Sequence, residues 1–170
     1  MAPPDPEVVK LNFDDSNNHY SATGGFLLRN WTGKVIKLGT TNYGQSLSLV
    51  AEARALKDGL CMAIQTGYST KCVEGDNLIV IQASKGLQQV PWQIKNIVQD
   101  VYTWLQQGLT VTFNHVFRET NIAADWLSKF GHMITNTFTA DLSISPLLRQ
   151  ILSDDVIGRT FVRKGALIQF

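Results

Sequence analysis

Apolar and polar residues alternate along the segment 8–14, Val-Val-Lys-Leu-Asn-Phe-Asp. A period of two is typical of a strand that is buried on one face only. Two further segments, 23–29 and 34–41, have strand-like composition, and Gly33 lies in the short turn between them. Because a short turn joins antiparallel strands, these two segments are expected to form a hairpin.

The hydrophobic period changes after residue 46. Apolar residues now recur at helical spacing as far as Gly67, which is a suitable residue for the end of a helix. A strand at 70–76 follows this helical crossover and is therefore expected to lie parallel to the first strand. The remaining pattern predicts a short helix at 78–87, an amphipathic helix beginning at Pro91, a strand at 110–117 and a helix at 121–132.

These elements predict an α/β fold. Its five-stranded mixed sheet has three antiparallel strands first, then two strands parallel to the first, and helices flank the sheet. Length and composition suit one domain, since the chain has 170 residues, of which 44% are hydrophobic and 17% are charged. We expect a Pro-rich flexible leader or linker at 1–7, the domain at 8–133, and at 134–170 an extension that packs on the domain or is partly flexible. A short helix at 144–152 would lie in this extension.

The net charge and the cysteine content indicate which partners the protein can bind and in which compartment it functions. A net charge of +1 provides no long-range attraction for nucleic acid, so a nucleic-acid partner would need a local basic groove. Cys61 and Cys72 are the only cysteines, which favours a reduced intracellular protein, nuclear or cytoplasmic and not secreted. No apolar run is long enough to span a membrane. We expect no membrane partner, no organic cofactor, and either a monomer or a domain of a longer polyprotein.

Four acidic residues occupy positions that the predicted fold is expected to bring close together. Asp14 and Asp76 end strands, Glu52 borders the buried face of the first helix, and Asp125 begins the last helix. Four converging carboxylates would repel one another, and a divalent cation would remove that conflict. Oxygen ligands favour Mg²⁺ or Mn²⁺, and two such ions support phosphodiester cleavage. His115, ten residues before Asp125, suits proton transfer.

Each of these residues also has an ordinary structural explanation. An acid at a strand end can be a turn former, Glu52 could be a solvated residue at a helix edge, and His115 could be a partly buried strand histidine. Four unrelated surface acids on a general scaffold remain the alternative to a metal site.

The segments around these residues resemble the motifs of type I ribonuclease H. They are 10–14 (KLNFD), 51–56 (AEARAL), 73–76 (VEGD) and 115–125 (HVFRETNIAAD). The last segment is most similar to the plant subgroup found as a domain of non-LTR retrotransposon polyproteins and related host genes. Pro91-Trp92, the segment 145–148, Asp155 and Arg163 also fit this subgroup. The resemblance covers residues 8 to 165.

The resemblance implies a set of roles at matching positions. It makes four carboxylates the ligands of two Mg²⁺ or Mn²⁺ ions when substrate is bound: Asp14, Glu52, Asp76 and Asp125. It makes His115 the residue that assists proton transfer or product release, and Asn121 a residue that holds the loop of His115. Arg118 and Glu119 would be structural supports, and the candidate substrate-binding residues are Asn17, Asn18 and Ser48. The implied reaction is endonucleolytic cleavage of the RNA strand of an RNA–DNA hybrid, leaving 3′-hydroxyl and 5′-phosphate ends.

The sequence departs from the family pattern in three places. The residue after the first acid is usually Gly and here is Asp15, which adds negative charge and lacks the backbone freedom of Gly. Many members have an Asn before the helix acid that contacts RNA 2′-hydroxyls, whereas Ser46 and Ser48 occupy that segment. Many cellular members carry a basic, Trp-rich insertion, but the middle helices here offer only Lys85 and Lys95. These departures predict weak substrate binding, and they favour the alternative of a weakly active or inactive nucleic-acid-binding or interaction module.

Overall fold

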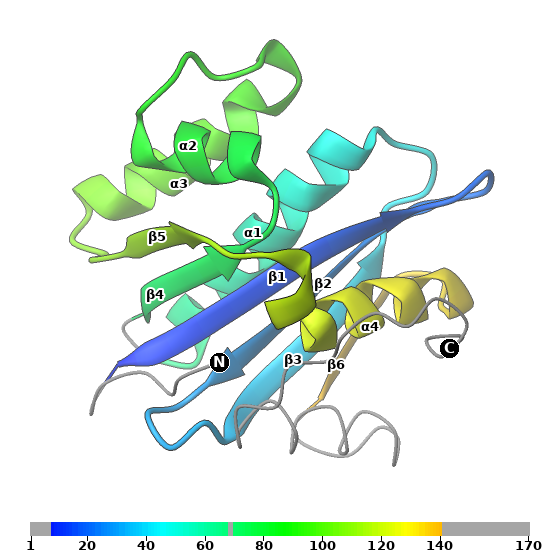
Figure 1. Cartoon of the computed structure of the whole chain (residues 1–170), viewed down its shortest axis with the longest axis horizontal. Helices are drawn as coiled ribbons and strands as arrows, with labels where there is room; N and C mark the ends of the chain where they lie inside the picture. Colours follow the sequence, from blue (N-terminus) through cyan, green and yellow to red (C-terminus); the bar gives the residue numbers. More distant parts are fainter. Residues whose placement is uncertain (1–7, 68–69, 141–170) are drawn as a thin grey trace.

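The computed structural model describes residues 8–67 and 70–140 (Figure 1). The strands are β1 (Val9–Asn17), β2 (Ala22–Arg29), β3 (Val35–Asn42), β4 (Thr70–Gly75), β5 (Thr112–His115) and β6 (Thr137–Ala140). The helices are α1 (Ser48–Gln65), α2 (Leu78–Lys85), α3 (Lys95–Gln106) and α4 (Ile122–Phe130), with short 3-10 turns η1 (Trp92–Ile94), η2 (Arg118–Thr120) and η3 (Gly131–Met133). Among the described helices, none is both long and apolar enough to cross a membrane.

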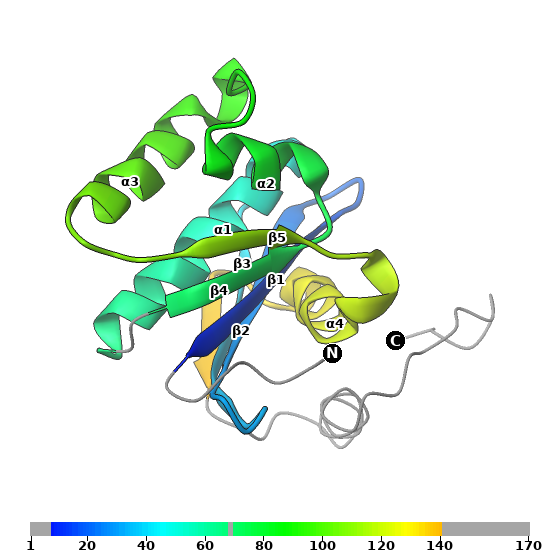
Figure 2. The same cartoon turned by 60° about the vertical axis from the view of Figure 1, so that its left-hand side comes forward.

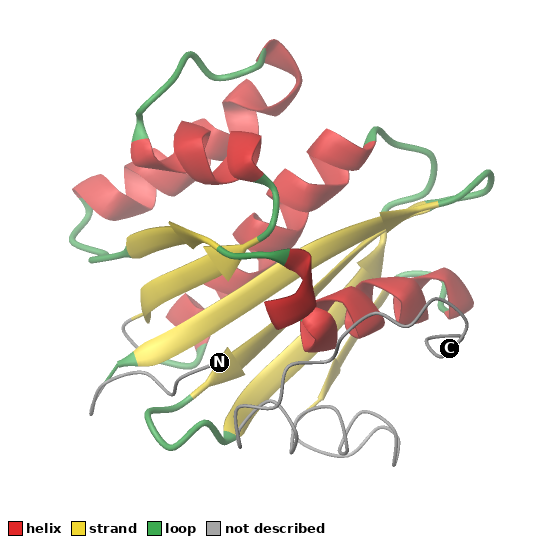
Figure 3. Ribbon diagram, in the orientation of Figure 1, coloured by secondary structure: helices red, strands yellow, loops and turns green. Residues whose placement is uncertain are grey.

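The strands form one mixed sheet in the order β5-β4-β1-β2-β3-β6. β1, β2 and β3 pair antiparallel, whereas β4 is parallel to β1 and β5 is parallel to β4. The predicted α/β class and strand directions are therefore confirmed (Figure 3). The predicted number of five strands is wrong, because β6 pairs antiparallel with β3, with Phe138 opposite Thr40. The sequence assigned β6 to the C-terminal extension, since four residues are too few to establish a period.

β1 is longer than the sequence predicted. The strand was expected to end at Asp14 but continues through Asp15 to Asn17, where the antiparallel partner β2 provides the backbone hydrogen bonds. The parallel pairing with β4 ends earlier, at Asn12. Asp14 thus lies inside a strand, two residues beyond the last residue of β1 that pairs with β4. The leader 1–7, the expected helix at 144–152 and the motif residues beyond 140 lie outside the described residues.

Helices cover both faces of the sheet (Figure 2). α1 and α3 pack on one face over a cluster that includes Leu11 and Phe13, and α4 packs on the other face over Leu27 and Leu38. Consecutive glycines in β2 allow both helices to approach closely. A Cβ atom on Gly24 would lie 2.8 Å from the Ala55 Cβ in α1, and one on Gly25 would lie 2.8 Å from the Leu127 Cβ in α4. Both helices therefore pack closely against β2.

Candidate active site

Three acidic side chains from different elements meet at this edge of the sheet. Asp14 lies on β1, Glu52 one turn into α1, and Asp76 directly after β4, and each offers a carboxylate oxygen within 4.8 Å of the others. β1 and β4 are parallel neighbours, so their carboxyl ends reach the same edge, as predicted. The structure therefore brings these three acids together at one edge of the sheet.

Because these acids are buried, their negative charges are unfavourable unless a cation binds to them. Glu52 is fully buried and Asp14 is 2% exposed, so neither acid is the solvated surface residue that remained an alternative. In the part of the chain that the structure describes, both carboxylate oxygens of Glu52 and Oδ2 of Asp14 have no hydrogen-bond partner. Buried polar atoms are nearly always paired in native proteins, so these oxygens are suited to a ligand.

The pKa values of the acids also show that their ionised forms are unfavourable in this buried group. Burial raises the pKa of Glu52 well above its ordinary value, and the charge of Asp14 raises it further. Burial and the charges of Asp76 and Asp125 raise the pKa of Asp14 in the same way. Burial also raises the pKa of Asp76, although the Arg118 guanidinium opposes that shift. A divalent cation would let all three acids ionise at neutral pH, and hard oxygen ligands suit Mg²⁺ or Mn²⁺.

Asp125 stands beside this group and has a cationic partner. It lies in the first turn of α4, buried, and its charge acts on Asp14 and Asp76. Its Oδ2 lies 2.7 Å from the Nζ of Lys129, one helical turn later. Asp76 also has a cation nearby, since its carboxylate lies 3.7 Å from the Nε of Arg118. Two of the four acids thus have a cationic partner, and the spacing of four residues between Asp125 and Lys129 is visible in the sequence.

The loop after β5 forms the other side of the site. His115 is exposed, so the alternative of a partly buried strand histidine is wrong. Its Nε2 lies 3.0 Å from the backbone carbonyl oxygen of Asp76, and since a carbonyl only accepts, Nε2 donates and Nδ1 holds the lone pair of the neutral ring. The ring of Phe117 meets the imidazole edge to face at 6.1 Å. An open depression of about 360 Å³ lies here, lined by Asp14, Asp15, Asp76, Asn77, His115, Val116, Phe117 and Arg118.

Asn121 connects the start of α4 to β1. Its Nδ2 donates to the carbonyl oxygen of Phe13 at 2.8 Å, and its Oδ1 accepts from the Nδ2 of Asn12 at 3.3 Å. Its own carbonyl oxygen accepts from the backbone amide of Asp125, so this residue fixes the first turn of α4 beside Asp14. The structure thus places Asn121 against β1, whereas the sequence expected it to hold the loop of His115. Glu119 lies exposed in η2.

The three candidate substrate-binding residues lie around the end of the β1–β2 hairpin and the start of α1. Asn17 donates from Nδ2 to the carbonyl oxygen of Ser46 at 2.9 Å, and Asn18 accepts from two backbone amides in its own turn. Ser48 donates from Oγ to the Oδ2 of Asp15 at 2.5 Å. Asp15 is an ordinary strand residue opposite Gly24, so the backbone cost expected for a residue other than Gly does not arise.

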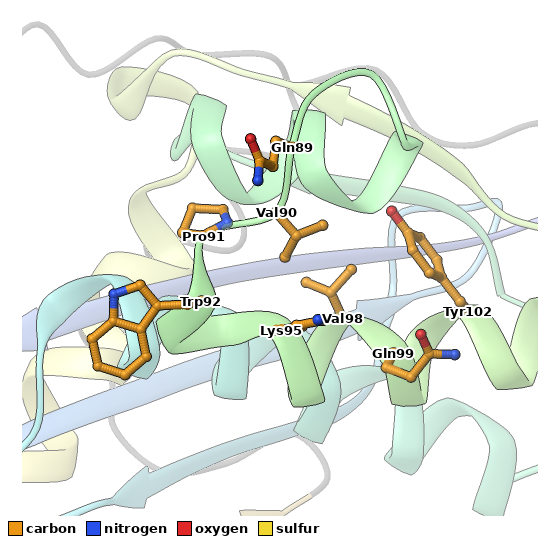
Figure 4. Close-up of a pocket in the computed structure, with 8 residues that line it drawn as sticks. All are labelled: Gln89, Val90, Pro91, Trp92, Lys95, Val98, Gln99 and Tyr102. Carbon is orange, nitrogen blue, oxygen red and sulfur yellow. The ribbon is translucent and has the colours of Figure 1, made fainter.

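A larger hollow of about 670 Å³ lies apart from the acids, between the end of α2 and α3 (Figure 4). Its lining includes Val90, Pro91, Trp92 and Tyr102, and Lys95 is the charged residue among the lining side chains. The indole of Trp92 is 81% exposed. This hollow offers one cation and no acid, so metal chemistry belongs to the smaller depression and not here.

Solved structures with a similar fold include ribonuclease H domains. RNase H1 from the halophilic archaeon Halobacterium salinarum is 23% identical with a TM-score of 0.69, over 74% of this chain and 97% of that one. An N-terminal RNase H domain from Mycobacterium tuberculosis is 22% identical with a TM-score of 0.67, over 72% and 91% of the two chains. LC11-RNase H1 in complex with an RNA/DNA hybrid is 19% identical with a TM-score of 0.64, over 70% and 92%.

These structural similarities show that this protein has the RNase H-like fold. The family model described as reverse transcriptase-like matches residues 12–131, and the chain belongs to that family. No curated protein matches the chain by sequence.

Proposed function

We propose that this protein is a metal-dependent endoribonuclease that cleaves the RNA strand of RNA–DNA hybrids. The observation that carries the proposal is the pair of buried, unpaired carboxylates of Glu52 and Asp14, which meet Asp76 at the sheet edge. For the stability of the fold alone, apolar side chains at these positions would be better than such a group of buried acids. Similar structures include one RNase H1 and one foamy viral protease–reverse transcriptase, each solved in complex with an RNA/DNA hybrid, which supports the choice of substrate.

The acids would hold the metal ions, with Asp14, Glu52 and Asp76 as the central ligands. Asp125 would join them through Oδ1, which is buried without a hydrogen-bond partner among the described residues. Mg²⁺ or Mn²⁺ held by these acids would supply Lewis acidity for phosphodiester hydrolysis. His115 carries a proton between the depression and solvent through its exposed ring. Lys129 and Arg118 offset part of the negative charge of Asp125 and Asp76.

The same proposal extends to the biological setting. The His115–Asp125 segment supports a place in the plant subgroup found in retrotransposon polyproteins and related host genes. The two free cysteines, Cys61 and Cys72, support a reducing nuclear or cytoplasmic environment. Residues 1–7 would serve as a leader or linker, and the protein would act as a monomer or as a domain of a longer polyprotein.

A specific observation favours a second candidate, an inactive nucleic-acid-binding module. The Asp125–Lys129 ion pair places an ammonium at 2.7 Å from the fourth acid, where it competes with a metal ion. Asp15 adds a further charge that repels phosphate. A module of this kind would bind hybrid in the absence of metal and would not cut it.

A cleavage assay separates the two candidates. A labelled hybrid is incubated with the protein in Mg²⁺, in Mn²⁺ and in a chelator, beside duplex DNA of the same sequence. The enzyme cuts only the RNA strand and only with metal, and Asp14→Asn, Glu52→Gln and Asp76→Asn each reduce cleavage to background. Asp100→Asn is the matched control, because this acid is exposed on α3 and pairs with Lys57 away from the site. Binding without cleavage under every metal condition would instead establish the module.

A further inference from the structure

A buried polar network joins β1, β4 and the start of α4. The Nζ of Lys10 in β1 lies 2.9 Å from the Oε1 of Glu74 in β4, and the Nδ2 of Asn12 donates to the Oε2 of the same carboxylate at 3.2 Å. The Nδ2 of Asn12 also donates to the Oδ1 of Asn121 at 3.3 Å, directly before α4. Each of the three elements that this network connects also leads to one of the proposed metal ligands.

The members of this network are withdrawn from solvent. Asn12 and Asn121 are each 1% exposed, and the side chains of Lys10 and Glu74 are 8% and 11% exposed. Moving an ion pair and amides out of water costs about as much as their mutual contacts return, so apolar side chains would stabilise the fold equally well. Hydrogen bonds are directional, however, and a buried network of them fixes the positions of its members. The network is therefore better explained by the positions that it fixes than by stability.

Asn12 and Glu74 occupy the last position at which β1 and β4 pair. The parallel register of the two strands ends with Asn12 opposite Glu74. Asp14 and Asp76 each follow two residues later, on backbone that this parallel register no longer includes. The hydrogen bond between Asn12 and Glu74 thus connects the two strands immediately before they bring their acids to the site.

Asn121 extends the same connection to the fourth acid. Its carbonyl oxygen accepts from the amide of Asp125, one helical turn later. Its Nδ2 donates to the carbonyl oxygen of Phe13, the residue before Asp14. A shift of Asn121 would therefore move Asp125 relative to Asp14. Three of the four acids thus lie two to four residues after a member of the network.

Building on the proposed function, we propose that Asn12, Glu74 and Asn121 are positioning residues that set the spacing of the metal ligands. They act through the backbone of β1, β4 and α4 and not as ligands themselves. Mg²⁺ requires nearly ideal octahedral geometry, whereas Ca²⁺ accepts irregular coordination. The spacing that the network fixes therefore determines the selectivity of the site for Mg²⁺ over Ca²⁺ as well as its affinity for Mg²⁺.

Asn12→Ala tests the network without changing any charge. Asn12 joins the network through Nδ2, since its Oδ1 has no hydrogen-bond partner in the described part of the chain, and alanine removes both bonds of that amide. Mg²⁺ and Ca²⁺ are titrated separately into the isotopically labelled full chain without nucleic acid, and affinity is read from the NMR shifts of the Asp14 and Glu52 amides. Mg²⁺ affinity should fall about 10–100-fold, the usual effect of losing a residue that orients metal ligands. Ca²⁺ affinity should fall by less than about threefold, because Ca²⁺ tolerates displaced ligands.

A second variant and a matched control complete the test. Glu74→Gln keeps the size of the side chain but weakens the anchor of Asn12, and it tests the proposal even if Asn12→Ala does not fold. The lost charge acts on both ions alike, so the ratio of Mg²⁺ to Ca²⁺ affinity is the quantity compared, and it should fall. Asn114→Ala is the control, because Asn114 lies opposite Glu74 on β5 and donates to the Sγ of Cys72 instead. It should leave both affinities unchanged.

The Mg²⁺ dependence of hybrid cleavage gives a second measurement. The Mg²⁺ concentration for half-maximal cleavage should rise in Asn12→Ala by the same factor by which Mg²⁺ affinity falls. Folded variants with the wild-type ratio of Mg²⁺ to Ca²⁺ affinity would overturn the inference and leave the proposed function intact, because a general loss of structure or charge weakens both ions equally. A wild-type protein that binds no Mg²⁺ removes the proposed function itself, and this inference with it.

Discussion

Replacing Glu52 by glutamine should stabilise the metal-free protein at neutral pH. The side chain is fully buried, and neither carboxylate oxygen has a hydrogen-bond partner within the described ranges. Its pKa is raised in the folded state, so the folded protein keeps a proton that the unfolded chain releases above the ordinary value of 4.5. Glutamine keeps the shape without the charge, and the neighbouring carboxylates of Asp14 and Asp15 can accept from its amide.

The size of the effect follows from proton linkage. Between the unfolded and folded pKa values, the unfolded state binds fewer protons, so stability falls as the pH rises, by about 1.4 kcal/mol per pH unit for each such group. Three pH units above 4.5, the cost of keeping Glu52 protonated reaches at most about 4 kcal/mol. Glu52→Gln should therefore gain up to that amount near pH 7.5 and almost nothing near pH 4.5.

Urea unfolding in a chelator, from pH 4.5 to 8, measures this difference directly. Mg²⁺ or Mn²⁺ should restore stability to wild type and not to Glu52→Gln, because the ion compensates the ionised acids. Asp100→Asn controls for the loss of a surface charge and should stay within about 1 kcal/mol at every pH. A difference between Glu52→Gln and wild type that does not grow with pH would refute the reasoning.

Three other outcomes are expected. His115→Ala should slow hybrid cleavage by about 10²–10⁴-fold in a single-turnover assay while thermal stability stays unchanged, since the ring is exposed; a rate near that of wild type would exclude the proton-transfer role. Gly25→Ala should destabilise the protein by about 1–3 kcal/mol in urea, because the new Cβ would clash with Leu127 and the Ser128 amide in α4; an unchanged midpoint would contradict the close packing. The logarithm of the binding constant for hybrid, plotted against the logarithm of the salt concentration, should have a slope of about −1.5 to −3.5, which corresponds to two to four phosphate contacts. A slope near −6 would mean that an additional basic surface exists.

The sequence predicted the parts of the site that depend on strand direction. Asp14 lies just beyond the part of β1 that pairs with β4, Asp76 follows β4, and topology alone brings such positions to one edge. The complete burial of Glu52 could not be predicted, because a helix-edge position does not reveal what the edge faces. β6 has four residues and no usable period.

The contacts around the acids were harder to predict than the acids themselves. The Asp15–Ser48 hydrogen bond depends on the twist of β1 beyond its parallel neighbour and on the first turn of α1, and no local pattern encodes it. The polar run after Asp14 has the composition of a turn, yet β2 pairs with it and extends the strand. The Asp125–Lys129 pair is different, since its spacing alone was sufficient to predict it.

Asp76 contributes to the site through two different groups, and this couples the position of the acid to that of His115. Its carboxylate belongs to the acid group, while its backbone carbonyl oxygen accepts from His115. A shift of the segment after β4 therefore carries the acid and the imidazole together and preserves the spacing between them. Glu52 belongs to a separate long helix. The distance between Asp76 and Glu52 therefore depends on how α1 packs against the sheet, whereas the distance between Asp76 and His115 is set by their hydrogen bond.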